Sequence, residues 1–154
     1  MINIVKVGGG IIENEKHLST FLNSFSKIPG KKILIHGGGR LATEFAKKLE
    51  VPTKMIEGRR VTDDAMLEIV TMVYGGLVNK KIVAALQANN INALGLSGAD
   101  GNIIKAHKRE VKELDYGWVG DIDEINTNLI LTLLDNNIVP VIAPLTHNGK
   151  GVML

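Results

Sequence analysis

The sequence predicts an α/β fold: a mostly parallel, open sheet flanked by helices on both faces (an α/β/α sandwich), with small β-hairpins. Two observations predict this class. Short apolar, β-branched runs alternate with segments of helical periodicity. Two of these runs end in glycine triplets, at 8–10 and 37–39, where a buried strand would pass into a helix. The length of 154 residues suits one domain with a sizeable core.

The first half of the chain alternates regularly. We expect a strand over 2–7, because this run is apolar and β-branched and ends in glycines. A helix over 13–28 follows, with apolar residues at helical spacing, and the pair Pro29-Gly30 ends it. A second strand over 32–36 leads through the second triplet into a helix that carries apolar residues from 41 to 49.

The second half is less regular. The segment KMIEGRRVT predicts a hairpin with Gly58 near its tip, and an N-cap signature at 62–64 starts a long helix over 63–88. Gly75 and Gly76 inside this helix cost roughly 1 kcal/mol each relative to alanine, which indicates a kink or the close approach of another backbone. The remaining expected elements are strands at 92–96, 103–107, 117–121 and 139–143, a helix at 126–137 and the beginning of a strand at 152–154.

Composition excludes several classes of function. Without cysteine, the chain has no disulfide and no thiol chemistry. The net charge of +2 contains no long run of one sign, so we expect neither a nucleic-acid nor a membrane partner. No run of about eighteen apolar residues and no signal-peptide core are present, so we expect no membrane span and a cytoplasmic protein. The histidines lack metal-ligand spacing, so no metal site within the chain is expected.

The glycine triplets predict an anion-binding site. Glycine lets the backbone approach a ligand closely, and the free N–H groups at a helix start attract anions. Because neighbouring parallel strands end at the same edge of a sheet, the two turns would face one ligand region. Lys6, at the end of the first strand, is placed to direct its ammonium group at a transferring phosphoryl group. A Walker P-loop has its lysine after the glycines, and the sequence contains no such match.

Other motifs support competing interpretations. The segment GGGRLA at 37–42 matches a dinucleotide fingerprint, with Glu57 about where a ribose-binding acid is expected. This interpretation predicts a nucleotide-dependent oxidoreductase, but it leaves the first triplet and Lys6 unexplained. Arg59 and Arg60 form a separate candidate, because guanidinium groups bind carboxylates with two parallel hydrogen bonds.

A hydrolase is the third interpretation. HGGG at 36–39 resembles an oxyanion-hole segment, and GLSGA at 95–99 falls one residue short of a nucleophile elbow around Ser97. Asp121 or Asp123 and His147 are its candidate partners. No apolar helix follows Ser97, which weighs against this interpretation.

Taken together and in order, six segments resemble the amino-acid kinase family. They are KVGGG (6–10), HGGGR (36–40), GRRVT (58–62), NKKIV (79–83), GLSGADG (95–101) and VGDI (119–122). The resemblance covers nearly the whole chain and is to the family's kinases of N-acylated glutamate. It implies transfer of a phosphoryl group from ATP, with Mg²⁺, to the side-chain carboxylate of N-acetylglutamate in arginine biosynthesis. N-succinylglutamate is the alternative acceptor.

The resemblance also implies roles for individual residues. Lys6 would be the catalytic residue that stabilises the transferring phosphoryl group. Gly8, Gly9 and Gly10 would bind phosphate, and Gly37, Gly38 and Gly39 would bind the acceptor substrate. Arg60 would bind a carboxylate of that substrate, and the hairpin around Gly58 would act as a lid.

Two differences from the family qualify the expectation. Family members are longer, so residues 1–154 would be the N-terminal, acylglutamate-binding lobe, with the ATP-binding C-terminal lobe absent or truncated. We therefore expect the chain alone to be inactive. The alternative to an enzyme is a non-catalytic binding or regulatory module. No helix precedes the first strand, which resembles the arginine-insensitive homodimers of the family. The long helix from Asp63 would then be the subunit contact.

Overall fold

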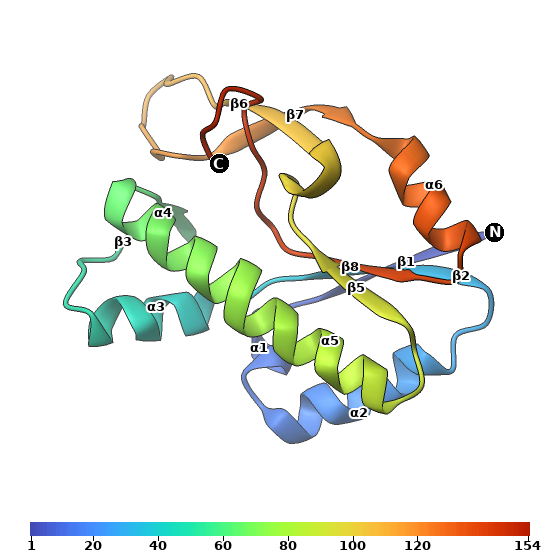
Figure 1. Cartoon of the computed structure of the whole chain (residues 1–154). Coiled ribbons are helices and arrows are strands. Elements are labelled where there is room, and N and C mark those ends of the chain that lie inside the picture. Colours follow the sequence, from blue (N-terminus) through green and yellow to red (C-terminus); the bar gives the residue numbers. More distant parts are fainter.

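A four-stranded parallel sheet forms the centre of the computed structural model, which describes residues 1–154 (Figure 1). The strands run in the order β1, β2, β8, β5. Their bounds are β1 Ile2–Val7, β2 Lys31–His36, β8 Val139–Ile142 and β5 Ala93–Leu96. All pairs in this sheet are parallel, which confirms the predicted sheet.

Helices cover both faces of the sheet, as predicted (Figure 1). Most lie on one side: α1 (Gly9–Ile12), α2 (Glu15–Ser26), α3 (Gly39–Lys48), α4 (Asp64–Val70) and α5 (Asn79–Ala88). Only α6 (Thr127–Asp135) packs against the other face. Alternation along β2 serves both layers: Leu34 joins the main core, whereas Ile33 packs with Leu134 of α6 in a small second core.

Side-chain caps set where the helices begin. Asn14 accepts a 3.0 Å hydrogen bond from the N–H of His17 and starts α2, so the helix expected from residue 13 begins at Glu15. The chain before Asn14 forms the separate short helix α1. Asp63 caps α4 in the same way, through the N–H of Met66 at 2.9 Å. A side-chain oxygen at this position satisfies one of the N–H groups that a helix start leaves unpaired.

The long helix is continuous from Asp64 to Ala88, but its middle turn is a π-helix, Thr71–Val78. Gly75 and Gly76 therefore lie where the helical pitch changes, and the side chain of Leu145, not another backbone, packs against Gly75. By length and composition alone, this helix could cross a membrane. In the structure its apolar residues form much of the main core beneath the sheet, among them Met66, Ile69, Val73, Ile82 and Leu86.

Two hairpins lie beside the sheet. The first pairs β3 (Lys54–Ile56) with β4 (Arg59–Val61), as predicted. The second pairs β6 (Ile104–Lys108) with β7 (Gly120–Ile125) after a 3₁₀ turn, Asp100–Asn102. The expected strand over 117–121 was misplaced, because Gly117 has a φ of 74° and bridges Thr62 instead. The expected strand over 152–154 is only a single bridge between Met153 and His147.

Candidate functional site

The two glycine turns meet at the carboxyl edge of β1 and β2. The N–H of Gly37 donates a 2.9 Å hydrogen bond to the carbonyl oxygen of Val7, which ties the second turn to the end of β1. A Cβ atom on Gly37 would lie 3.7 Å from the backbone nitrogen of Gly9. A Cβ atom on Gly9 would lie 3.8 Å from the nitrogen of Gly39. The structure thus brings together the two triplets that are separate in sequence.

Backbone N–H groups in both turns have no acceptor in the chain. Gly8 and Gly38 lie outside every helix and strand, and neither N–H donates a hydrogen bond. Gly9 and Gly39 are the first residues of α1 and α3, where N–H groups have no partner within the helix. Most N–H groups in folded proteins are paired. Unpaired donors from two adjoining turns therefore form a site suited to an anionic ligand.

Space is left open beside the first turn. No atom lies within 4 Å of the position that a Cβ atom on Gly8 or Gly10 would occupy. Gly8 has an ordinary extended conformation, with φ −86° and ψ 165°. Neither crowding at these two positions nor the backbone conformation of Gly8 thus requires a glycine. The open space leaves room for a ligand to approach the turn.

Arg60 extends from β4 to the second turn. Its Nη2 atom donates 2.7 Å hydrogen bonds to the carbonyl oxygen of Gly39 and to the hydroxyl of Thr43. Its Nη1 atom lies 3.6 Å from the sulfur of Met66. Two candidate site residues from different motifs, Arg60 and Gly39, are therefore in direct contact.

Lys6 lies at the same edge of the sheet, and its side chain contacts no polar partner. The residue is exposed, and its backbone pairs in register with Ile35 of β2. Its ammonium group takes part in none of the hydrogen bonds or ion pairs of the chain. Lys6 therefore retains a free positive charge beside the first triplet.

No group of three or more acidic or histidine side chains is placed to hold a metal ion.

Tyr74 is a site residue that sequence analysis missed. It lies in the π-helical turn, and a Cβ atom on Gly38 would lie 3.1 Å from its ring. Burial raises the pKa of the Tyr74 phenol above its ordinary value, and the charge and hydrogen bonding of Arg60 oppose this shift. The tyrosine thus supports the second turn from below and lies beside Arg60. An aromatic residue next to paired glycines in a helix was the available signal.

Glu13 is a second residue that was missed. Its Oε2 atom lies 3.5 Å from Nη1 of Arg40, so the pair links the end of α1 to the start of α3. Its buried Oε1 atom has no hydrogen-bond partner and would lie 3.3 Å from a Cβ atom on Gly9. A carboxylate thus lies next to the first turn, on the side of α1.

A cavity of about 330 Å³ opens next to Arg60. Its lining is mostly apolar and includes Tyr74, Val119, Leu145 and Leu154. Arg60 is the only charged residue in the lining. The geometry suits a ligand with one carboxylate at the rim and a short apolar group inside.

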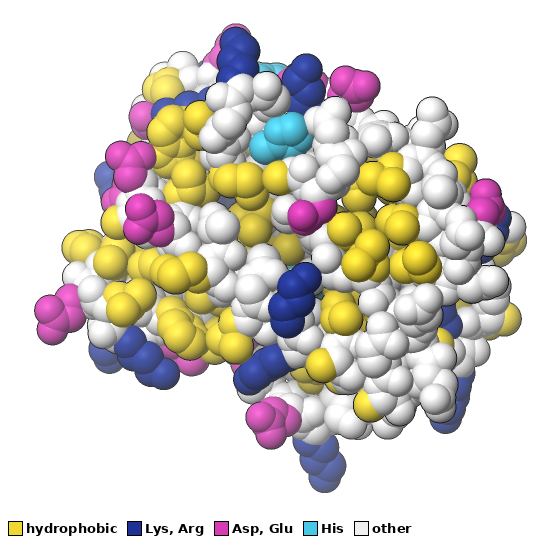
Figure 2. Space-filling view, viewed as in Figure 1, with side chains coloured by type: hydrophobic (Ala, Val, Ile, Leu, Met, Phe, Trp, Pro, Cys, Tyr) yellow, Lys and Arg dark blue, Asp and Glu magenta, His cyan; other side chains and the backbone are white.

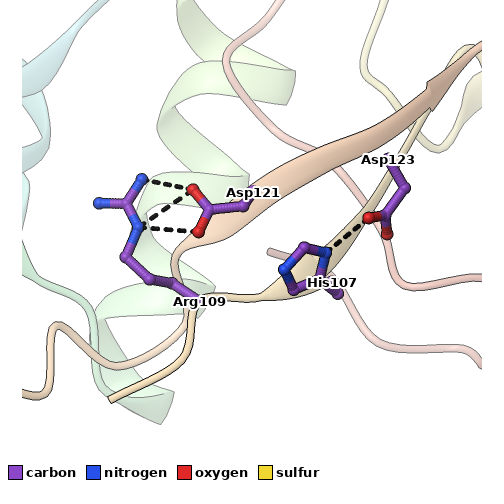
Figure 3. A network of polar contacts seen from close by, with 4 residues as sticks. All are labelled: His107, Arg109, Asp121 and Asp123. Carbon is purple, nitrogen blue, oxygen red and sulfur yellow. Dashed lines mark hydrogen bonds and ion pairs between the residues drawn. The ribbon is translucent and has the colours of Figure 1, made fainter. Parts of the chain in front are cut away.

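A separate polar hollow of about 610 Å³ lies between the two hairpins and is lined by Arg59. Figure 3 shows polar contacts of three residues that line it: Arg109 donates hydrogen bonds of 2.6 and 3.0 Å to Asp121, and His107 faces Asp123, outside the lining, at 2.6 Å. The hydrogen bonds from Arg109 lower the pKa of the Asp121 carboxyl. Arg59 therefore faces a different region from Arg60, although the two are adjacent in sequence.

The hydrolase residues do not assemble. The hydroxyl of Ser97 donates a 2.8 Å hydrogen bond to Asp100 within its own turn. Asp121 and Asp123 are held by Arg109 and His107. His147 accepts a hydrogen bond from the N–H of Gly149 in a different turn. No nucleophile and base are thus in contact.

The dinucleotide interpretation also lacks its acid. Glu57 has a φ of 50° in the turn between β3 and β4, at the tip of a hairpin. A ribose-binding acid belongs at the end of a core strand, next to the glycine turn. Only the glycine segment of that fingerprint is present.

Comparison with known proteins identifies the family. The amino acid kinase family matches residues 1–153. The chain belongs to the amino acid kinase family. Within this family, the chain is 55% identical over 153 residues to the acetylglutamate kinase of Bacteroides fragilis and 56% to that of Phocaeicola vulgatus. It is 39% identical over 156 residues to the acetylglutamate kinase of Methanopyrus kandleri. Each match includes 99% of the chain but only 59–61% of the length of the kinase. The chain thus spans about three fifths of the length of these relatives.

Solved structures share the fold of the chain. The smu.665 protein of Streptococcus mutans matches 99% of the chain and 62% of its own length, with a TM-score of 0.81 and 27% identity. An N-acetylglutamate synthase of Neisseria gonorrhoeae, solved with coenzyme A and N-acetylglutamate, has a TM-score of 0.82 over 99% of the chain and 35% of its own. At 22% identity, the second match shows the shared fold alone.

Proposed function

We propose that the chain is the acylglutamate-binding part of an acetylglutamate kinase, which transfers a phosphoryl group from ATP to the side-chain carboxylate of N-acetylglutamate. One observation carries the proposal: two adjoining glycine turns present unpaired N–H groups next to Arg60 and Lys6. The high identity to acetylglutamate kinases supports the choice of reaction.

Phosphoryl transfer needs positioning and charge stabilisation more than covalent chemistry. In the proposed site, Lys6 and the N–H groups of Gly8, Gly9 and Gly10 stabilise the charge of the transferring phosphoryl group. The turn at 37–39 holds the carboxylate that accepts it. The backbone donors are fixed by the fold before the ligand arrives, so little reorganisation of the two turns accompanies the reaction.

Arg60 and the cavity beside it account for the rest of the acceptor. The guanidinium group binds the α-carboxylate, since its remaining N–H groups can still donate while Nη2 is held by Gly39 and Thr43. The acyl group enters the mostly apolar cavity. The lining favours acetyl over succinyl, because a succinyl carboxylate would lack a second cation: Arg59 lines the other hollow.

The nucleotide is held largely outside residues 1–154. The chain has no cluster of acidic side chains that suits Mg²⁺, so the metal accompanying ATP would be held mainly by the phosphates and by other residues. When bound, Mg²⁺ would neutralise charge on the phosphates. We propose that residues 1–154 bind the acceptor but do not catalyse turnover alone.

A trapping assay tests these proposals. A protein of the length of these relatives, in which residues 1–154 are followed by a C-terminal lobe, is called the full-length protein. It is incubated with ATP, Mg²⁺ and N-acetylglutamate, and hydroxylamine converts the acyl phosphate into a hydroxamate. We expect hydroxamate from the full-length protein and none from residues 1–154. N-succinylglutamate should react far more slowly. No product from the full-length protein would refute the kinase proposal. Product from residues 1–154 would refute only the proposal that these residues do not catalyse turnover alone.

We further propose a cytoplasmic homodimer in which the long helix forms the contact. Figure 2 shows hydrophobic side chains gathered over α3 and α4. Met72 is 56% exposed and Leu49 55% exposed, and both line a wholly apolar hollow of about 370 Å³. Exposed apolar patches of this kind mark contact surfaces in soluble proteins.

A further inference from the structure

A buried polar pair lies beneath the second glycine turn. His36 ends β2, and Asn79 begins α5 directly after the π-helical turn. Each residue is only 1% exposed. A buried polar side chain destabilises the fold unless its hydrogen bonds are made. The proposed function uses neither residue, so their hydrogen bonds call for an explanation.

The hydrogen bonds of the pair determine where its protons lie. Nδ1 of His36 is 2.8 Å from the carbonyl oxygen of Gly37, which can only accept, so Nδ1 carries the proton. The amide nitrogen of Asn79 donates to the carbonyl of Val141 at 2.9 Å and to Nε2 of His36 at 3.1 Å, so Nε2 is unprotonated. His36 is therefore neutral, in its Nδ1–H tautomer. Burial also lowers its pKa, which agrees with a neutral ring.

Asn79 is held in the orientation that this assignment needs. Its Oδ1 atom accepts a 3.2 Å hydrogen bond from Lys80, whose ammonium group also reaches the carbonyl of Gly95. A Cβ atom on Gly95 would lie 1.9 Å from that Oδ1 atom, so glycine in β5 makes room for the amide. The hydrogen bonds of the amide with His36, Val141 and Lys80 come from β2, β8 and α5, and together they prevent the amide from rotating.

The hydrogen bond from His36 orients the peptide that follows it. No peptide bond in the chain is cis, so the carbonyl of Gly37 and the N–H of Gly38 point in opposite directions. When Gly37 turns its carbonyl toward the ring of His36, the N–H of Gly38 must point away from it. That N–H has no acceptor in the chain. Gly38 also has a φ of 153°, which glycine alone adopts readily.

We propose that His36, held in its Nδ1–H tautomer by Asn79, is a positioning residue that points the N–H of Gly38 at the carboxylate of the acceptor. The inference deepens the proposed function and rests on it, since the acceptor is the anion that the second turn binds. Without the ring hydrogen bond, the Gly37–Gly38 peptide is free to rotate and place a carbonyl where the anion should lie.

Nitrogen-15 NMR of the ligand-free protein tests the first half, independently of activity. We expect a protonated-type shift at Nδ1 of His36 and an unprotonated-type shift at Nε2. In Asn79→Asp, a carboxylate cannot donate to Nε2, so we expect Nε2 to gain a proton. The reversed tautomer in the wild type would overturn the inference, as would a His36 signal that Asn79→Asp leaves unchanged.

Kinetics of the full-length protein test the second half. His36→Asn keeps an N–H donor near the position of Nδ1, whereas His36→Leu removes it. We expect His36→Leu to raise KM for N-acetylglutamate about tenfold, the equivalent of one hydrogen bond, with KM for ATP unchanged. His36→Asn should recover most of this loss. Thermal unfolding curves establish that each variant is folded at the assay temperature.

The outcomes separate the two proposals. Equal KM increases in His36→Asn and His36→Leu, or no increase in a folded His36→Leu, would refute the positioning role while leaving the kinase proposal intact. If the wild-type protein phosphorylates no acylglutamate, the proposed function fails instead, and with it the role assigned to the Gly38 N–H. The NMR result would then still report the tautomer.

Discussion

Arg60 and Gly39 are joined by a 2.7 Å hydrogen bond, from the guanidinium Nη2 atom to the glycine carbonyl oxygen. The contact connects the β3–β4 hairpin to the second glycine turn. With Arg60 bound to the α-carboxylate of the acceptor, the unpaired N–H groups of Gly38 and Gly39 remain for its side-chain carboxylate. The contact therefore gives the expected orientation of the acceptor in the proposed site.

Arg60→Lys should mainly weaken acceptor binding. Lysine has no planar fork, so it cannot hold Gly39 and Thr43 while also binding a carboxylate through two parallel bonds. We expect KM for N-acetylglutamate in the full-length protein to rise about tenfold or more, with little change in kcat. Arg59→Lys is the matched control and should change neither. A fall in kcat at constant KM would reverse the role given to Arg60.

Lys6→Arg should show the opposite pattern. The bulkier guanidinium keeps the charge but moves it from the position of the phosphoryl group, so kcat should fall by about a hundredfold or more. KM for N-acetylglutamate should change little. Lys16→Arg, at an exposed position of α2, provides the control. If Lys6→Arg altered only KM, Lys6 would be a binding residue and not a catalytic one.

Gly38→Ala and Gly10→Ala should separate backbone strain from ligand approach. At Gly38, alanine would have an unfavourable φ of 153° and a Cβ atom 3.1 Å from the Tyr74 ring. Urea unfolding should show a loss of about 1–3 kcal/mol. At Gly10 nothing lies within 4 Å of a Cβ atom, so stability should change by less than about 0.5 kcal/mol. Activity should nevertheless fall in Gly10→Ala, and normal activity there would argue against a phosphate next to Gly10.

The burial of His36 predicts how stability depends on pH. Its pKa is lowered in the folded state from an ordinary value of 6.5, because burial disfavours the charged ring. As the pH falls through that value, the unfolded chain binds a proton that the folded chain does not, so the free energy of unfolding decreases. Urea unfolding at pH 7.5 and 5.5 should show a larger loss in the wild type than in His36→Asn. The other histidines are present in both proteins, so equal losses would exclude a contribution from His36.

The exposed apolar surface predicts the effect of a charge at Met72. Glutamate there would place a carboxylate in the proposed subunit contact, so Met72→Glu should convert a dimer to a monomer. Light scattering after gel filtration measures the mass directly. Lys81→Glu provides the control, because Lys81 is exposed on the same long helix but lines neither of the hollows that Met72 lines. A wild-type monomer, or a Met72→Glu dimer, would contradict the proposed interface.

Local patterns were sufficient to predict most of the fold. The alternation of apolar runs and helical periodicity predicted the parallel sheet, and the shared edge of such a sheet predicted that the two triplets would meet. The parallel pairing of the strands confirms the first expectation, and the close approach of Gly9 and Gly37 confirms the second. The cap at Asp63 lies within three residues of the N–H group that it binds, and this short-range feature was predicted from sequence, whereas the equally local cap at Asn14 was not.

Features that depend on distant contacts were missed. Gly117, expected to begin a strand, instead bridges Thr62, and β7 begins at Gly120; no local pattern shows this distant pairing. The π-helical turn brings Tyr74 under Gly38, and the sequence indicated only that the paired glycines were unusual. His36 and Asn79 are 43 residues apart and meet only in the folded chain. A polar asparagine at the end of an apolar helical stretch was the one available signal.

An amide titration tests the central claim most directly. Two-dimensional NMR of residues 1–154 follows the backbone N–H signals as N-acetylglutamate is added. We expect saturable shifts concentrated at Gly38, Gly39 and the side chain of Arg60, with weaker changes in the first turn until a nucleotide is bound. Shifts confined to the hollow between the hairpins, or the absence of any saturable shift in the folded chain, would contradict it.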